Sequence, residues 1–217
     1  MSPQADNDGA WVRVRNATRV YGKRQVVRVD ALDIGPGEAI QIAGANGAGK
    51  STLLRMLAGY GAPSAGKISF NADFRRSRIV YLPQGGGLYG RLTVLQNIEI
   101  LSRLLGNKLA VDDRLVGPAY QLGVAPMLNT RVQDLSGGWQ RMAAIACLFA
   151  TDPQGVFLDE PLSSLDGDAQ TAVLSLLASW MNPSRFVVFT VHAPLDLPWI
   201  TGAIAVKAGA SSEKGAA

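Results

Sequence analysis

The feature that most constrains the fold is a glycine-rich segment at residues 44–52. Its sequence is Gly44-Ala45-Asn46-Gly47-Ala48-Gly49-Lys50-Ser51-Thr52, which matches the G-x-x-x-x-G-K-[ST] pattern of phosphate-binding loops. The apolar run 39–43 precedes it and predicts a buried strand, and apolar residues at helical spacing follow it as far as Gly59. A strand, a glycine loop and a helix in this order predict an α/β fold with a phosphate site at the loop.

The physical basis of this phosphate loop (residues 44–52) is its charge and its free space. Glycine lets the backbone curl tightly, so that several N–H groups point inward at anionic oxygens. The helix that begins near Lys50 adds the positive end of its dipole. The Lys50 ammonium would contact the outer phosphates of a nucleotide, and the Ser51 hydroxyl would bind Mg²⁺. The alternative is a glycine turn that merely precedes a helix, and the matching flanks argue against it.

Composition and charge exclude several classes of protein. The chain has 217 residues, of which 47% are hydrophobic, and this supports a globular fold with a sizeable core. The net charge of +4 is mild and no long basic block occurs, so we expect no nucleic-acid partner. The single cysteine, Cys147, excludes a disulfide framework and a cysteine zinc site. No run approaches the ~18 apolar residues of a membrane span, and residues 1–9 lack a secretory signal. We therefore expect a cytoplasmic protein that reaches a membrane only through a partner.

The periodicity of the chain changes twice between residues 11 and 207. Residues 11–34 alternate in short stretches, which predicts antiparallel β structure beside the nucleotide core. Residues 88–138 change to a helical period, and their length of about fifty residues suits an inserted subdomain better than a loop. Buried strands and helices then return up to residue 207. We expect one domain over residues 10–207, with flexible tails at 1–9 and 208–217.

Polar side chains follow three of the predicted buried strands. They are Gln84, the pair Asp159 and Glu160, and His192. In an open α/β sheet, ligands bind beyond the carboxyl ends of the strands, so these groups should converge on one nucleotide. Asp159 would hold Mg²⁺ directly or through water. Glu160 should point away from Asp159, because side chains alternate along an extended chain, and it could then deprotonate a water. A lone histidine is often structural, but the place of His192 favours contact with the terminal phosphate.

A second glycine-rich turn, Ser136-Gly137-Gly138, precedes another predicted helix. A capping serine, free N–H groups and the helix dipole again favour a phosphate. The phosphate loop already wraps one side of its nucleotide, and this Ser-Gly-Gly turn (residues 136–138) belongs to the helical insert. The simplest arrangement places the turn against the nucleotide of a second copy related by a two-fold axis.

Tyr21 lies 23 residues before Gly44 and ends a predicted strand. Its ring could stack on a nucleotide base, or it could pack at the edge of the sheet. The residues themselves leave both interpretations open.

Taken in order, these motifs resemble the ATPase subunit of an ATP-binding cassette (ABC) transporter over about residues 11–207. The motifs are the phosphate loop, Gln84, Leu135-Ser136-Gly137-Gly138, Phe157-Leu158-Asp159-Glu160-Pro161, Ser164-Leu165-Asp166 and His192. The resemblance implies an α/β fold: a P-loop NTPase (RecA-like) core with an N-terminal antiparallel β subdomain and an inserted helical subdomain. It implies ATP and Mg²⁺ as cofactors. As partners it implies a transmembrane subunit and a second ATPase, either an identical copy or a paralogue, and so a place at the inner face of the cell membrane.

The same resemblance assigns roles to individual residues. Tyr21 would stack on adenine, Glu160 would be the catalytic base, and His192 would contact the γ-phosphate. Gln84 would sense Mg²⁺ and the attacking water. Ser136, Gly137 and Gly138 would bind the γ-phosphate across a head-to-tail dimer, and Asp166 would join the interface.

The chain departs from the family at Trp139, where a glutamine is usual, and at Met142 and Cys147, where arginine is frequent. No catalytic group is lost by these changes. Residues 88–97 resemble the exporter-type branch, and the segment His192-Ala193-Pro194-Leu195 is similar to that of the haem exporter ATPase of cytochrome c maturation.

Three other classes share all or part of the pattern. A soluble cassette ATPase of the iron–sulfur assembly type has every motif and differs only in its partner. A chromosome-type cassette protein would need a long coiled coil where this chain has about fifty residues between Gln84 and Ser136. A P-loop kinase would leave the Ser-Gly-Gly turn and His192 unexplained.

Overall fold

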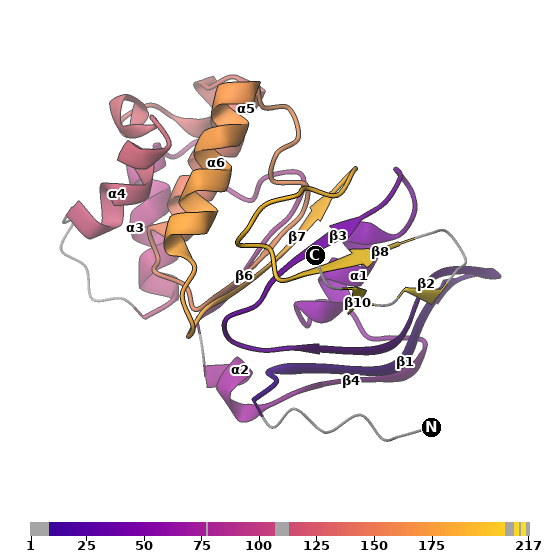
Figure 1. The fold of residues 1–217 in the computed structure, drawn as a ribbon. Helices are drawn as coiled ribbons and strands as arrows, with labels where there is room; N and C mark the ends of the chain where they lie inside the picture. Colours follow the sequence, from indigo (N-terminus) through magenta and orange to yellow (C-terminus); the bar gives the residue numbers. More distant parts are fainter. Residues whose placement is uncertain (1–8, 77, 107–112, 207–210, 213, 216–217) are drawn as a thin grey trace.

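The computed structural model describes residues 9–76, 78–106, 113–206, 211–212 and 214–215. Its centre is a six-stranded sheet with the order β10-β8-β3-β7-β6-β5, in which all neighbouring pairs except β10 and β8 are parallel (Figure 1). The strands, in chain order, are β3 (Ala39–Ala43), β5 (Ile79–Leu82), β6 (Gly155–Leu158), β7 (Phe186–Val191), β8 (Gly202–Ala205) and β10 (Lys214–Gly215).

The central strands β3, β6 and β7 are buried along their whole length, as their apolar sequences predict. Successive side chains of β7 enter two different hydrophobic cores. Phe186 and Val188 pack with helix α1 (Lys50–Leu57) and the antiparallel sheet, whereas Val187 and Phe189 pack with the helical part. The phosphate loop leaves the sheet between these cores, because it joins β3 to α1.

A second, four-stranded sheet has the order β4-β1-β2-β9 and covers the α1 side. Its strands are β1 (Val12–Tyr21), β2 (Arg24–Ile34), β4 (Ala65–Phe70) and β9 (Ser211–Ser212). The pairs β1–β2 and β1–β4 are antiparallel, which confirms the expectation for the N-terminal part of the chain. A short helix, α2 (Ala72–Arg76), follows β4.

The remaining helices gather at the opposite side of the central sheet (Figure 1). They are α3 (Val94–Leu104), α4 (Asp113–Gln121), the 3₁₀ turns η1 (Ala125–Met127) and η2 (Val132–Asp134), α5 (Gly137–Phe149) and α6 (Gly167–Trp180). Thr93 caps α3 and forms a reciprocal capping box with Gln96. Cys147 is fully buried in α5, and this burial raises the pKa of its thiol to about 12.

The sequence of residues 112–122 predicts a helix that is broken near Pro118 or starts after it, and this prediction is wrong. Helix α4 runs through Pro118, and the helical pattern continues because the Leu122 N–H donates to the Pro118 carbonyl at 3.0 Å. The proline costs the helix one internal hydrogen bond. Asp112, where the predicted helix would begin, lies outside the described residues.

The expectation of a flexible tail over residues 208–217 needs correction at two short stretches. Residues Ser211–Ser212 pair in parallel with β2, and Lys214–Gly215 pair antiparallel with β8. Both β2 and β8 would otherwise end a sheet, and an edge strand offers open backbone groups for such pairing.

Within the described part of the chain, no helix combines the length and the apolar character that crossing a membrane requires.

Candidate functional site

The phosphate loop is held in place by close backbone contacts. Gly47 and Gly49 adopt left-handed φ values of 72° and 109°. A Cβ atom on Gly49 would lie 2.7 Å from the Val26 carbonyl oxygen, and one on Gly44 would lie 2.4 Å from that of Val206. Glycine is therefore required at both positions by the neighbouring strands as well as by the curl of the loop.

Lys50 begins α1 and is almost fully buried. Its ammonium donates hydrogen bonds to the carbonyl oxygens of Gly44, at 2.8 Å, and Ala45, at 3.3 Å. It also forms an ion pair with Glu160 Oε1 at 3.5 Å. The loop thus wraps a positive charge, as anion recognition requires.

Asp159 is fully buried directly after β6. Its Oδ1 atom accepts hydrogen bonds from the hydroxyls of Ser51 and Thr190, both at 2.9 Å. Its Oδ2 atom is buried and accepts no hydrogen bond that the described residues show. A buried carboxylate oxygen without a donor, beside a serine hydroxyl, is the hard oxygen set that Mg²⁺ prefers. The described residues hold no cluster of three ionisable ligands, so phosphates and water would complete the coordination, as is usual for Mg²⁺.

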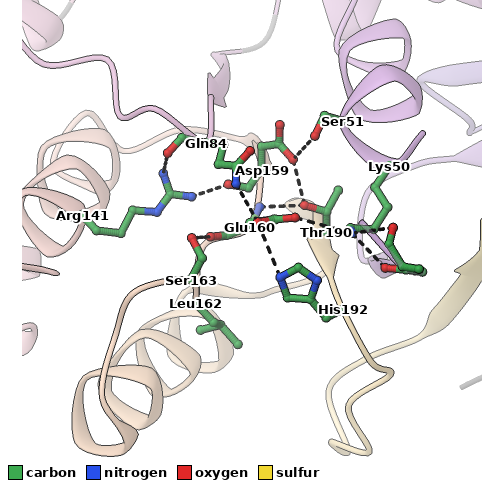
Figure 2. Close-up of polar contacts among 12 residues, drawn as sticks. Lys50, Ser51, Gln84, Arg141, Asp159, Glu160, Leu162, Ser163, Thr190 and His192 are labelled. Atoms are coloured by element: carbon green, nitrogen blue, oxygen red, sulfur yellow. Dashed lines mark hydrogen bonds and ion pairs between the residues drawn. The ribbon is translucent and has the colours of Figure 1, made fainter. Parts of the chain in front are cut away.

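Glu160 is the point where four segments meet (Figure 2). Its Oε2 atom accepts a hydrogen bond from Gln84 Nε2 at 2.8 Å and lies 3.6 Å from His192 Nε2. The predicted reason for its direction is wrong. Strand β6 ends at Leu158, and Glu160 has a left-handed φ of 49°, so a strained turn, and not strand alternation, aims the carboxylate.

One cavity brings the phosphate loop and the polar side chains at the strand ends together. It has a volume of about 370 Å³ and is lined by residues of the phosphate loop together with Gln84, Glu160 and His192. The convergence of the strand ends, which the sequence predicts, is present in the structure. The exposed fraction of the His192 side chain is 55%, so it can reach a ligand from the rim.

Thr190 is a member of this site that the sequence did not reveal. Its hydroxyl donates to Asp159 Oδ1 and accepts the Glu160 N–H at 2.6 Å. One buried hydroxyl therefore fixes both adjacent acids. In the sequence, Thr190 is one position in the apolar run of β7, with no spacing that marks it.

Two further ionisable side chains, Arg141 and Tyr81, interact electrostatically with Asp159. Burial lowers the pKa of the Arg141 guanidinium, and the nearby Asp159 and Glu160 carboxylates oppose this shift. Burial likewise raises the pKa of the Tyr81 phenol, which accepts a hydrogen bond from Arg55 Nε at 3.2 Å. Arg141 stands close to the positions where the family often has arginine, but no role was predicted for it, since a charged helix residue usually faces solvent.

The Ser-Gly-Gly turn belongs to a different cavity. Ser136, Gly138 and Trp139 line a space of about 650 Å³ with Asp166, and none of the described residues that line the phosphate-loop cavity belongs to the turn. Ser136 occupies the N-cap position of α5, but its hydroxyl makes no capping hydrogen bond. The expected capping role is therefore wrong, and the hydroxyl is available to a ligand. Asp166 caps α6 by accepting the Ala169 N–H at 2.9 Å.

Tyr21 ends β1 with 54% of its surface exposed. The Arg19 guanidinium lies 4.8 Å from the centroid of its ring. An exposed ring is able to stack on a planar ligand, but the role in adenine binding stays a prediction.

Comparisons with known proteins agree with this geometry. The family model described as ABC transporter matches residues 27–163. The chain is 31% identical over 185 residues to the Nod factor export ATP-binding protein I of Rhizobium etli, covering 82% of this chain and 58% of the relative. It is 36% identical over 189 residues to a xylose/arabinose import ATP-binding protein of Haloferax volcanii, covering 83% and 49%.

Among solved structures, the fold is similar to a dimeric ATP-binding cassette in a post-hydrolysis state bound to ADP and Pi. The TM-score is 0.81 at 24% identity, with 94% of this chain and 98% of that chain covered. This likeness shows the fold: the α/β nucleotide-binding core, the antiparallel sheet and the helices agree with the expected class.

The chain spans less than two thirds of the length of the first curated relatives it matches. Those relatives are named for Nod factor export, so the comparisons give no support to the haem-export assignment. The family is shown by the model, which covers more than half of the chain: this protein belongs to the ABC transporter family.

Proposed function

We propose that the chain is the ATP-binding and ATP-hydrolysing subunit of an ABC transporter. The observation that carries this proposal is the cavity that joins the phosphate loop to Gln84, Glu160 and His192. Phosphoryl transfer to water needs positioning and charge neutralisation and little covalent chemistry from the protein. The cavity offers both.

Each side chain has a task that its geometry allows. Lys50 and the loop N–H groups hold the phosphates, and Ser51 and Asp159 hold Mg²⁺, which when bound neutralises charge on the phosphate oxygens. Glu160 orients and deprotonates the attacking water, with Gln84 at 2.8 Å as its partner. His192 contacts the terminal phosphate from the rim.

The second half of the site comes from another ATPase subunit, identical or paralogous. The Ser-Gly-Gly turn lies with Asp166 in its own cavity. A head-to-tail dimer would bring this turn onto the γ-phosphate held by the other copy's phosphate loop, with Asp166 at the interface. The dimeric cassette structure supports such an arrangement.

Mixing two inactive variants tests the shared site. Lys50→Ala removes the phosphate charge and Ser136→Ala removes the hydroxyl of the turn, so each homodimer has two damaged sites. In a mixed dimer both defects can fall on the same site, which leaves the other site intact. We expect the mixture to recover ATPase activity in a steady-state phosphate-release assay.

The matched control mixes each variant with itself at the same total concentration. Activity that stays at the level of the separate variants, although differently tagged copies co-purify as mixed dimers, would contradict a site shared between two copies.

We further propose that the subunit drives a separate transmembrane subunit and lies at the inner face of the cell membrane. Export is the favoured direction because the first relatives are named for Nod factor export, although a sugar import protein also matches. Purification from membranes in mild detergent should recover an integral-membrane protein in a fixed ratio to this chain. Recovery of the chain with soluble assembly proteins alone would favour the iron–sulfur assembly type.

A further inference from the structure

Arg141 is a buried cation that connects three parts of the site. It lies on α5, five positions after Ser136, and only 5% of its surface is exposed. One guanidinium nitrogen donates to the carbonyl oxygens of Pro83, at 2.9 Å, and Gln84, at 3.3 Å. The other terminal nitrogen donates to the Asp159 carbonyl oxygen in a short hydrogen bond. Figure 2 shows the side chain reaching from its helix to both segments.

These carbonyls belong to the two segments that carry Gln84 and Glu160, the two side chains assigned to the attacking water. Gln84 directly follows one of them, and Glu160 directly follows Asp159. The Gln84 amide and the Glu160 carboxylate meet at 2.8 Å. The planar guanidinium presents its donors in a rigid fork, so it can hold two backbone segments at a fixed separation, which a single point charge cannot do.

Packing alone does not account for an arginine here. Its neighbours on α5, such as Met142 and Ile145, are buried apolar side chains. A buried guanidinium is costly, and its Nε atom is buried and makes no hydrogen bond that the described residues show. This cost of burial is offset because the guanidinium donates hydrogen bonds to three carbonyl oxygens and lies near the Asp159 and Glu160 carboxylates.

We propose that Arg141 is a positioning residue for ATP hydrolysis, which sets the distance between Gln84 and Glu160 and ties both to the helix that carries the Ser-Gly-Gly turn. Arg141 does not line the phosphate-loop cavity, and it acts through the two backbone segments that it holds. The inference rests on the proposed function, because the distance matters only if this pair handles the attacking water.

The test compares Arg141→Lys with wild type in three measurements: kcat, the Kd of ATP and the thermal midpoint. Lysine keeps the charge but cannot span all three carbonyls. A displacement of catalytic groups by about 1 Å can cost about 100-fold in rate, so we expect kcat to fall about 10- to 100-fold. The Kd of ATP should change less than about 3-fold, because the phosphate loop is untouched.

The matched control is Ile145→Ala, which creates a cavity in the same helix without touching the site. It should lower the thermal midpoint at least as much as Arg141→Lys while kcat, measured well below that midpoint, stays near wild type. If Arg141→Lys behaves in the same way, its role is structural and the proposal is overturned.

A double-mutant cycle with Gln84→Ala adds a readout that stability does not move. If Arg141 acts through Gln84, then Arg141→Lys should cost much less on the Gln84→Ala background than on wild type. Additive losses in kcat would overturn the proposal. Failure of the proposed function would look different, since the wild-type chain itself would then not hydrolyse ATP.

Discussion

Glu160→Gln is expected to stop ATP turnover and to accumulate an ATP-bound dimer. Glutamine keeps the size of the side chain and can still meet Gln84, but its amide cannot accept the proton of the attacking water. A positioned general base contributes about 10²- to 10⁴-fold to a rate, so kcat should fall by at least about 10²-fold. The lost negative charge also removes repulsion of the γ-phosphate, which favours the closed state with bound ATP.

Size-exclusion chromatography with light scattering, in ATP and Mg²⁺, measures the accumulated dimer, and phosphate release measures turnover. Glu99→Gln, a half-buried acid on α3, makes the same chemical change outside the site. That control should hydrolyse ATP as wild type does. A Glu160→Gln protein that stays monomeric with ATP and turns it over normally would remove Glu160 from the role of base.

The core of this fold could be predicted because its signals are local and periodic. Continuous apolar runs give β3, β6 and β7, and the phosphate loop fixes the strand before it and the helix after it. The meeting of Gln84, Glu160 and His192 follows from one topological rule, since parallel strands end at the same edge of a sheet. The strand order itself carries no local signal, so it is known only from the structure.

The parts that escaped prediction depend on single side chains that cross the fold. Thr190 and Arg141 hold Asp159 and Glu160 through hydrogen bonds to their backbones and to the Asp159 carboxylate, between residues 18 to 31 positions apart. No spacing rule marks such a bond, and both residue types have commoner roles elsewhere. The left-handed turn at Glu160 is likewise invisible in the sequence, because non-glycine residues rarely adopt it.

The tail (residues 208–217) and the Ser-Gly-Gly turn show a different limit of prediction from sequence. Residues 211–215 are small and polar, and their pairing depends on two sheet edges that only the assembled fold offers. The turn was expected to be capped by Ser136, but the hydroxyl makes no such bond. In both cases a local preference predicted one arrangement and the structure shows another.

Lys50→Ala is expected to weaken ATP binding by about 10- to 100-fold, which corresponds to about 1.4–2.8 kcal/mol. A buried ammonium in contact with phosphate oxygens forms charge-assisted hydrogen bonds, and alanine replaces none of them. The same change removes the bonds that tie the side chain to the Gly44 and Ala45 carbonyls, so the loop also loses part of its preorganised curl. Equilibrium binding of radiolabelled ATP with Mg²⁺ measures the Kd directly.

Lys67→Ala provides the matched control, because Lys67 is an exposed lysine on β4. Its loss should leave the Kd of ATP unchanged, whereas an equal and small effect in both variants would contradict the phosphate-loop assignment. Comparison with Glu160→Gln then separates ATP binding, which forms the dimer, from ATP hydrolysis, which releases it. If Lys50 governs binding and Glu160 governs release, then Lys50→Ala stays monomeric at ATP concentrations that hold Glu160→Gln as a dimer, although both variants fail to turn ATP over.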